Sequence, residues 1–193
     1  MDILLLGPQG SGKGTQAKRV VEEFGIPHIS TGDMLREAME NGSEIGRRVR
    51  SIYDQGELVP DDLIIALIEE RLGADDAACG FVLDGFPRTL AQADALDAML
   101  AAIGRRLDAV LFFDVPDEVG FERALKRAEL ESRKDDTPEA IRKRLAIYHS
   151  ETKPIVEHYR ATGKLVPLHA ERSIEDVWNE ITRSLEMLGE DAA

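Results

Sequence analysis

The feature that most constrains this chain is a glycine-rich turn directly after an apolar segment at its start. The segment Ile3-Leu4-Leu5-Leu6 is typical of a buried strand, and it is followed by Gly7-Pro8-Gln9-Gly10-Ser11-Gly12-Lys13-Gly14-Thr15. Glycines adopt backbone angles that let successive N–H groups turn inward around phosphate oxygens, at the positive end of the next helix. The spacing matches the phosphate-binding loop G-x-x-x-x-G-K-[ST], except that Gly14 stands between Lys13 and Thr15. In such a loop Lys13 supplies a cation for the β- and γ-phosphates, and Thr15 a hydroxyl close to magnesium. The alternative is a glycine-rich turn without a ligand, and the strand before it and the position of Lys13 disfavour it.

Net charge and composition limit the kinds of ligand and partner that this chain can bind. The length of 193 residues fits one domain, and the formal net charge of −13 disfavours general nucleic-acid binding, because a phosphate polymer would be repelled. An anionic ligand must therefore be held by a local cluster of cations. The single cysteine, Cys79, excludes an internal disulfide and a multi-cysteine metal site, and we expect it to be a small buried residue. The N-terminus does not resemble a signal peptide and no apolar run approaches membrane-spanning length, so we expect a cytoplasmic protein with no membrane partner.

Strand and helix patterns alternate along the chain. Short apolar runs predict strands at residues 3–6, 27–29, 81–84, 109–114 and 165–168. Helical spacing and cap residues predict helices at about 13–24, 30–40, 44–55, 61–72, 90–103, 118–129 and 138–160, and one after Ser173. Asp61 is the expected cap of the fourth helix, and the lone His28 is interpreted as structural. This alternation predicts an α/β fold with a parallel sheet covered on both faces, which binds ligands at the carboxyl ends of its strands.

Four motifs in order carry a resemblance. They are Gly10-Ser11-Gly12-Lys13-Gly14-Thr15, Ser30-Thr31-Gly32-Asp33-Met34-Leu35-Arg36, Asp84-Gly85-Phe86-Pro87-Arg88-Thr89 and Arg133-Lys134-Asp135-Asp136. Together they resemble the adenylate kinases, within the nucleoside monophosphate kinase family, over the whole length. The chain departs from the family pattern at three places. Pro8-Gln9 stands where the family often has proline at the second position, and the long insertion of some members is absent between Arg127 and Arg133. Ala128 and Glu131-Ser132 stand where relatives with a short lid often have glycine.

The resemblance implies a P-loop NTPase-type five-stranded parallel sheet with helices on both faces, in a single kinase domain spanning 1–193. Its expected parts are a core of 1–29, 60–127 and 137–193, an AMP-binding subdomain of 30–59 and a short lid of 128–136. The implied reaction is ATP + AMP ⇌ 2 ADP with Mg²⁺ and no zinc, and a monomer is the family default.

Phosphoryl transfer needs positioning and charge neutralisation more than covalent help. By resemblance, Arg36 and Arg88 hold the AMP phosphate, and Arg133 and Arg144 close over the phosphates from the lid. Arg123 and Arg127 are four residues apart on one predicted helix face, so both can point toward ATP. Their alternative is surface pairing with Glu122, Glu129 or Glu131, whereas Arg47, Arg48, Arg50 and Lys143 fit a solvated face.

The full set of implied site residues is as follows. The catalytic residues are Lys13, Arg88, Arg123, Arg127, Arg133 and Arg144. ATP contacts Gly10, Ser11, Gly12, Lys13, Gly14, Thr15, Arg123, Arg127 and Arg172. AMP contacts Thr31, Arg36, Glu57, Leu58, Val59, Gly85, Phe86, Pro87, Arg88, Gln92, Arg133 and Arg144. Asp33 and Asp84 hold magnesium through its waters, although Asp33 could be only a helix cap and Gln92 only a polar residue on an exposed helix face.

Two other functions compete with this prediction. A UMP/CMP kinase has a similar layout, but its relatives tend to have alanine in place of Thr31 and asparagine in the loop after Arg88. A nucleotide-dependent switch protein would keep the phosphate loop but lack a second nucleotide site, which the loop 84–88 and the inserted helices disfavour.

Overall fold

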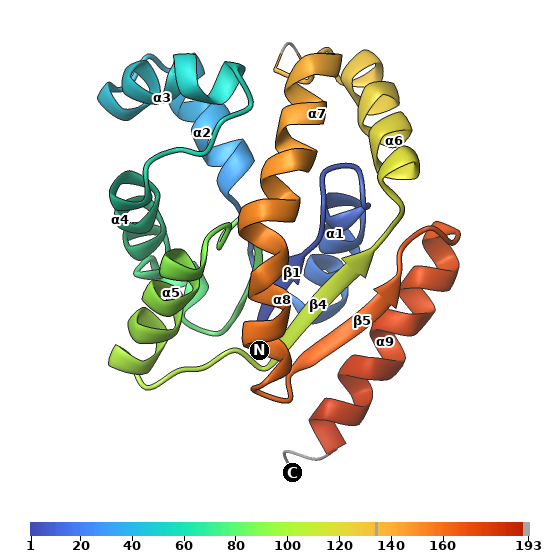
Figure 1. The fold of residues 1–193 in the computed structure, drawn as a ribbon. Coiled ribbons are helices and arrows are strands. Elements are labelled where there is room, and N and C mark those ends of the chain that lie inside the picture. Colours follow the sequence, from blue (N-terminus) through green and yellow to red (C-terminus); the bar gives the residue numbers. More distant parts are fainter. Residues whose placement is uncertain (134, 191–193) are drawn as a thin grey trace.

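The computed structural model describes residues 1–133 and 135–190, so Lys134 of the predicted lid lies outside the described residues. Within this part, a five-stranded parallel sheet has the strand order β2-β3-β1-β4-β5. The strands are β1 (Asp2–Leu6), β2 (His28–Ser30), β3 (Phe81–Asp84), β4 (Ala109–Asp114) and β5 (Leu165–His169). The α/β prediction is confirmed, and Figure 1 shows the sheet at the centre of the molecule.

Helices connect the strands throughout. They are α1 (Lys13–Phe24), α2 (Thr31–Glu40), α3 (Glu44–Asp54), α4 (Asp61–Leu72), η1 (Asp75–Ala77), α5 (Leu90–Ala102), α6 (Asp117–Leu130), α7 (Pro138–Ile147), η2 (Tyr148–Thr152), α8 (Lys153–Arg160) and α9 (Ile174–Glu190). None of these helices, within the ranges described, combines the length and apolar character needed to cross a membrane.

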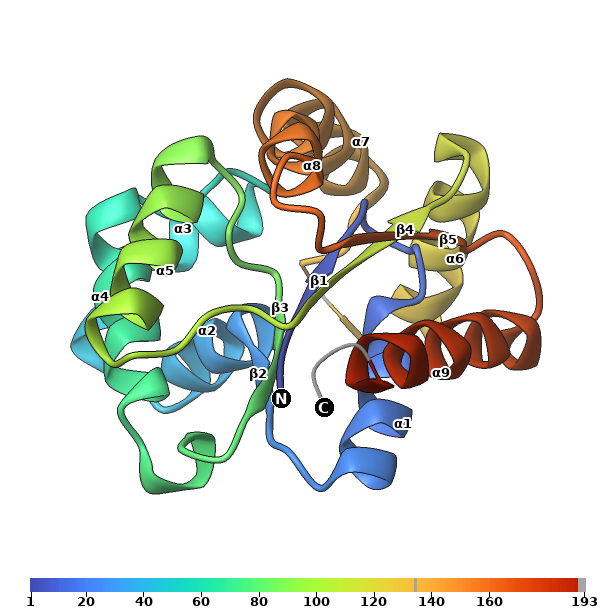
Figure 2. The same cartoon turned by 90° about the horizontal axis from the view of Figure 1, so that it is seen from below.

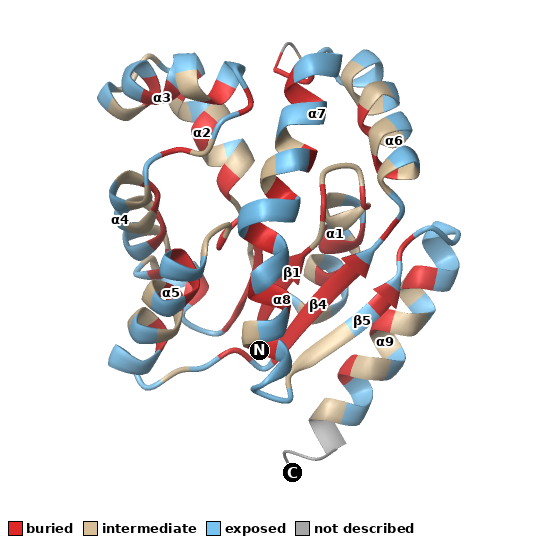
Figure 3. Cartoon of the chain, viewed as in Figure 1, coloured by how far each residue is buried: buried red, intermediate tan, exposed pale blue. Residues whose placement is uncertain are grey.

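Alternate residues of each strand pack on opposite faces of the sheet. Ile3 and Leu5 of β1 pack with α1 and α9, whereas Leu4 and Leu6 pack with α4, α5 and α8. Figure 2 shows the two helical layers on either side of the strands. Strands β1 and β4 are buried along nearly all their length, and edge strand β5 is partly exposed (Figure 3). Its Pro167 is tolerated because an edge strand has a side without ladder hydrogen bonds.

Three local predictions were wrong. The continuous helix expected over 138–160 is interrupted by the π-helical turn η2, just before Pro154. Proline lacks an N–H and its ring crowds the carbonyl four residues earlier, so a regular α-helix cannot pass through this point. Asp61 does not cap α4, because Pro60 is the N-cap and the Asp61 carboxylate bonds to Thr89 and Gln92 instead. Cys79 is exposed, since it lies in the turn that precedes β3 rather than in the core.

Candidate active site

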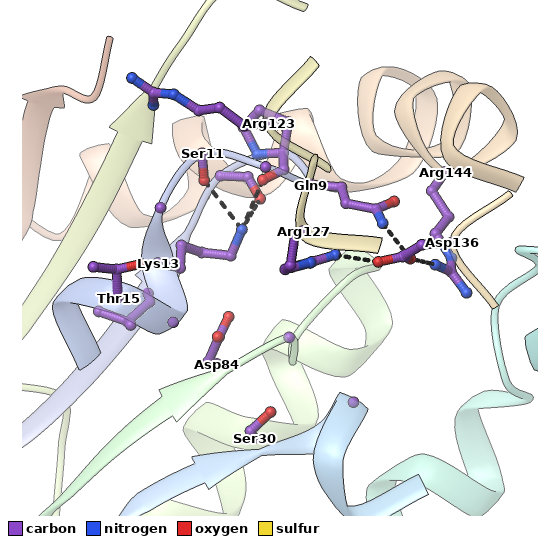
Figure 4. Close-up of a pocket in the computed structure, with 18 of the residues that line it drawn as sticks. Gln9, Ser11, Lys13, Thr15, Ser30, Asp84, Arg123, Arg127, Asp136 and Arg144 are labelled. Carbon is purple, nitrogen blue, oxygen red and sulfur yellow. Dashed lines mark hydrogen bonds and ion pairs between the residues drawn. The ribbon is translucent and has the colours of Figure 1, made fainter. Parts of the chain in front are cut away.

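A cleft of about 960 Å³ opens at the carboxyl ends of the strands, where the α/β topology predicts a ligand. Its walls come from the loops after β1, β3 and β5, the first turn of α2, the segment after α3, and helices α6 and α7. Segments far apart in the sequence therefore meet in one cavity, part of which is drawn in Figure 4.

The start of α1, at the phosphate loop, faces this cleft without a side-chain cap. The N-cap of α1 is Gly12, in the left-handed region with φ 92°, and no side chain caps the helix. The Thr15 N–H donates to the Gly12 carbonyl at 3.1 Å, whereas the N–H groups of Lys13 and Gly14 remain available to an anion in the field of the helix dipole. A Cβ on Gly10 would lie 1.9 Å from the carbonyl oxygen of Gly120, so glycine is what allows α6 to begin against the loop.

Lys13 folds over this loop. Its Nζ donates to the carbonyl oxygens of Gly7 at 2.7 Å and Pro8 at 2.8 Å, and to Ser11 Oγ at 3.2 Å (Figure 4). Burial lowers the pKa of Lys13 from 10.5 to about 8, and nearby Arg88 and Arg127 add to this effect while Asp84 opposes it. The ammonium group therefore sits where a bound phosphate would stabilise its charge.

Arg88 is fixed through its backbone and its guanidinium group. Its N–H donates to Gln92 Oε1 at 2.7 Å, its Nε donates to the Gly85 carbonyl at 2.8 Å, and its own carbonyl accepts from Thr152 Oγ1 at 2.9 Å. Thr152 belongs to the π turn η2, a kind of turn that is frequent at functional sites. Burial lowers the pKa of Arg88, which favours binding of a negatively charged group beside it.

Arg36, on α2, lies across the cleft from the phosphate loop. Its Nη1 donates to the Tyr53 hydroxyl at 2.5 Å and approaches Asp135 at 3.9 Å, and its Nη2 pairs with Asp33. Burial acts to lower the pKa of Arg36, but Tyr53 and these carboxylates outweigh it and the net shift is upward. Asp33 is correspondingly held ionised: its burial is outweighed by the hydrogen bonds from Arg36 and Ser30, and its pKa is lowered.

One buried carboxylate joins the lid to the phosphate loop. Asp136 accepts from Gln9 Nε2 at 2.6 Å, Arg127 Nη2 at 2.6 Å and Arg144 Nη1 at 2.5 Å (Figure 4). Arg144 also reaches Asp135 at 3.2 Å. The sequence prediction treated this aspartate pair only as part of a motif and missed its contacts. Three chain segments converge on Asp136, and only the fold brings them together.

The remaining predicted arginines also reach the cleft wall. Arg123 donates to the carbonyls of Ala170 at 2.7 Å and Glu171 at 3.0 Å, which anchors the loop that carries Arg172. Within the described residues, Arg123 and Arg127 form no ion pair with Glu122, Glu129 or Glu131, and that alternative was wrong for this part of the chain. Arg133 does pair with Glu131, at 2.6 Å.

The residues predicted to recognise the AMP base are only partly in the wall. Glu57 and Leu58 line the cleft, whereas Thr31, Val59 and Gln92 are 1%, 8% and 2% exposed and lie behind it. Gln92 bonds to the Arg88 N–H and, at 2.6 Å, to Asp61, so it is no exposed polar residue of a helix face. Thr31 donates to the Asp84 carbonyl at 3.3 Å. In the loop that follows, Gly85 and Pro87 line the cleft and Phe86 is buried.

Comparison with known proteins assigns the chain to a family. A family model described as adenylate kinase matches residues 5–164. The chain belongs to the adenylate kinase family. A relative named adenylate kinase from Caulobacter vibrioides is 50% identical over 186 residues, which covers 96% of this chain and 97% of the relative. Relatives of the same name from Kosmotoga olearia and Archaeoglobus fulgidus are each 43% identical over 215 residues, covering 97% of this chain and 100% and 99% of the relatives.

The lengths of these alignments show that some relatives contain residues that this chain lacks. The two that span 215 positions are longer than the 193 residues of this chain, so those relatives contain residues with no counterpart here. The Caulobacter alignment of 186 positions stays within the length of this chain. The family thus includes longer members and members of this length.

Two carboxylates of this adenylate kinase family member, Asp33 and Asp84, face the cleft and are candidates to bind magnesium. Asp84 points from the end of β3 into the space below Lys13 and Arg127 (Figure 4), and His28 Nε2 lies 3.7 Å away. Burial acts to raise the pKa of Asp84, but His28, Lys13 and Arg88 outweigh it, so its pKa is lowered and the carboxylate is ionised at neutral pH. No group of three or more potential metal ligands occurs within 1–133 and 135–190. Magnesium needs few protein ligands because it keeps several waters and binds phosphates, so Asp84 fits it.

Proposed function

We propose that this protein catalyses the reversible transfer of a phosphoryl group from ATP to AMP, which yields two molecules of ADP. The observation that carries the proposal is that one cleft is lined by two separate cationic groups that come from different elements. The phosphate loop with Lys13 forms one group, and Arg36 with Arg88 forms the other. A nucleotide switch would require only the first.

On the donor side, we assign the ATP phosphates to the backbone N–H groups of residues 10–15 and to Lys13. We assign Arg123 and Arg127 to ATP and the transferring group, and the backbone near Arg172 to the adenine of ATP. Gln16 supports this wall, since its Nε2 donates to the Ile174 carbonyl at 2.9 Å. The bond that breaks joins the γ-phosphorus to the oxygen of the β-phosphate, and Lys13 and Arg127 neutralise the charge that develops there.

On the acceptor side, Arg36 and Arg88 hold the AMP phosphate and direct one of its oxygens at the γ-phosphorus. We assign recognition of the adenine to the cleft-lining Glu57, Leu58, Gly85 and Pro87. Thr31, Val59, Phe86 and Gln92, directly behind this wall, complete the assigned site. Gln92 retains hydrogen-bonding capacity beyond its two protein contacts, because an amide offers two donor hydrogens and two acceptor lone pairs.

Closure of the lid is the conformational change that we expect to commit the bound nucleotides to reaction. Asp136 holds Arg127 and Arg144 in this structure, and we propose that the nucleotide phosphates take over these guanidinium groups together with Arg133. Residues 128–136 then cover the cleft and exclude water, which competes with AMP for the phosphoryl group. The division into core, AMP-binding subdomain 30–59 and lid 128–136 is part of this proposal.

Magnesium, when bound, neutralises charge on the β- and γ-phosphates. Asp84 would hold the ion through its waters, and Asp33 is the second candidate, although its carboxylate pairs with Arg36. We further propose a zinc-free monomer located in the cytoplasm, with no nucleic-acid or membrane partner.

The test is the rate of ADP formation with ATP as donor and AMP, CMP, UMP or GMP as acceptor. We expect the highest kcat/KM for AMP, and very slow phosphate release from ATP alone. A preference for CMP or UMP would replace the proposal with a UMP/CMP kinase, and hydrolysis as fast as transfer would contradict the role of the lid.

A further inference from the structure

Tyr53 is the one cleft-lining tyrosine of α3, and neither the motifs nor the charge pattern singled it out. Its side chain is buried, with 8% of the residue exposed. Gly56 lies three residues after it, and a Cβ on Gly56 would lie 2.8 Å from the carbonyl oxygen of Ala140 on α7. The turn after α3 is therefore packed directly against α7, the helix that also carries Arg144.

The hydroxyl of Tyr53 lies among the cations of the acceptor side. It accepts from Arg36 Nη1 at 2.5 Å, and it lies 3.5 Å from where a Cβ on Gly32 would be, over the first turn of α2. Arg144 stacks over the Tyr53 ring at 5.2 Å and donates to its backbone carbonyl at 3.1 Å. Within the described residues the hydroxyl hydrogen has no acceptor, although a phenol both accepts and donates.

An anionic group already occupies the neighbouring space. The carboxylate of Asp135, 8% exposed as a residue, lies 3.9 Å from Arg36 Nη1 and 3.2 Å from Arg144 Nη2. The same cations that border Tyr53 thus attract negative charge to this point. A phosphate that displaced Asp135 would meet the free hydrogen of the Tyr53 hydroxyl as well as the guanidinium groups.

We infer that Tyr53 is a binding residue of the acceptor site, whose hydroxyl donates a hydrogen bond to the phosphate of the acceptor nucleotide. This inference rests on the proposed function and adds a neutral donor to the arginines assigned above. A neutral donor increases the affinity for the phosphate without adding another positive charge to the cluster of arginines. Because the bond is made equally before and during transfer, it contributes to KM for AMP and not to kcat.

The experiment compares the unaltered protein with Tyr53→Phe, which keeps the ring and removes only the hydroxyl. A hydrogen bond to a charged group corresponds to a rise of about tenfold or more in KM for AMP, with kcat and KM for ATP within about twofold. Adenosine lacks the phosphate, so its inhibition constant against AMP should not change. Equal weakening of adenosine and AMP would identify a structural role and overturn the inference.

Two further variants separate a direct contact from an indirect one. Tyr159→Phe is the matched control, because its hydroxyl bonds to Asp97 at 3.3 Å and does not line the cleft, and we expect no change in KM for AMP. If Tyr53 acted only by orienting Arg36, Tyr53→Phe would have no effect in an Arg36→Ala background, and the inference would fail. We expect the loss to persist there. Absence of ADP formation by the unaltered protein would instead refute the proposed function itself, and an unchanged KM in an active Tyr53→Phe enzyme would refute this inference alone.

Discussion

Lys13 should take up a proton when ATP binds at alkaline pH. Its pKa in the free protein is lowered from 10.5 to about 8, chiefly by burial. Bound phosphates would replace the loop carbonyls as partners of Nζ and return the pKa toward its usual range. Binding should therefore take up about half a proton per ATP at pH 8, about nine-tenths at pH 9 and almost none at pH 6.5.

Isothermal titration calorimetry in two buffers of different ionisation enthalpy measures this uptake directly. Lys13→Arg is the diagnostic variant, because a guanidinium group stays charged across the whole range and should abolish the uptake at saturating ATP. Lys143→Met is the control, since Lys143 pairs with Glu57 on an exposed surface and should leave the uptake unchanged. Uptake below about a tenth of a proton at pH 9, or the same uptake in Lys13→Arg, would refute the reasoning.

The same lowered pKa has a consequence for stability. A lysine whose pKa is lower in the folded state than in the unfolded state destabilises the fold most at low pH, where it is charged in both states. This cost is full below about pH 8 and disappears as the pH rises to about 10.5, a change of about 3 kcal/mol in the free energy of unfolding. Lys13→Met should therefore be more stable, relative to the unaltered protein, at pH 7 than at pH 10.5, and denaturant unfolding at the two pH values tests the sign.

Four substitutions test other parts of the site and the lid. Arg88→Ala should lower kcat by about 10³-fold or more while thermal stability changes little, and a loss under about tenfold would contradict its assignment. Gln92→Ala should weaken the preference for AMP over CMP and UMP in kcat/KM, and it should also lower the free energy of unfolding by about 1–3 kcal/mol, because the Asp61 carboxylate and the Arg88 N–H lose their partner. Ser132→Gly should stabilise the protein by about 1 kcal/mol, since Ser132 has a left-handed φ of 52°, whereas Ala128→Gly, inside α6, should destabilise it by a similar amount. If the melting temperatures of both glycine variants changed in the same direction, this account would be contradicted.

The phosphate loop and the parallel sheet could be predicted from local sequence, because each depends on residues close together in the chain. An apolar run followed by glycines and Lys13 specifies a strand, a turn and a helix in a single stretch. The alternation of such segments then requires a covered parallel sheet, with the loops after its strands at one edge. Arg36 and Arg88 could be named because they lie in motifs that follow strands at that edge. Arg127 was indicated by its helical spacing from Arg123, and Arg144 was implied by the family resemblance alone.

The partners of these residues could not be read from the sequence, since they depend on long-range packing. Nothing local indicates that Asp136 would bind Gln9, which precedes it by more than a hundred residues, or that Tyr53 would lie between Arg36 and Arg144. Gln92 has the sequence context of a surface residue and is buried because α5 packs its first turn against Asp61 of α4. A buried polar group requires a partner, and only the folded chain determines which residue comes within hydrogen-bonding distance.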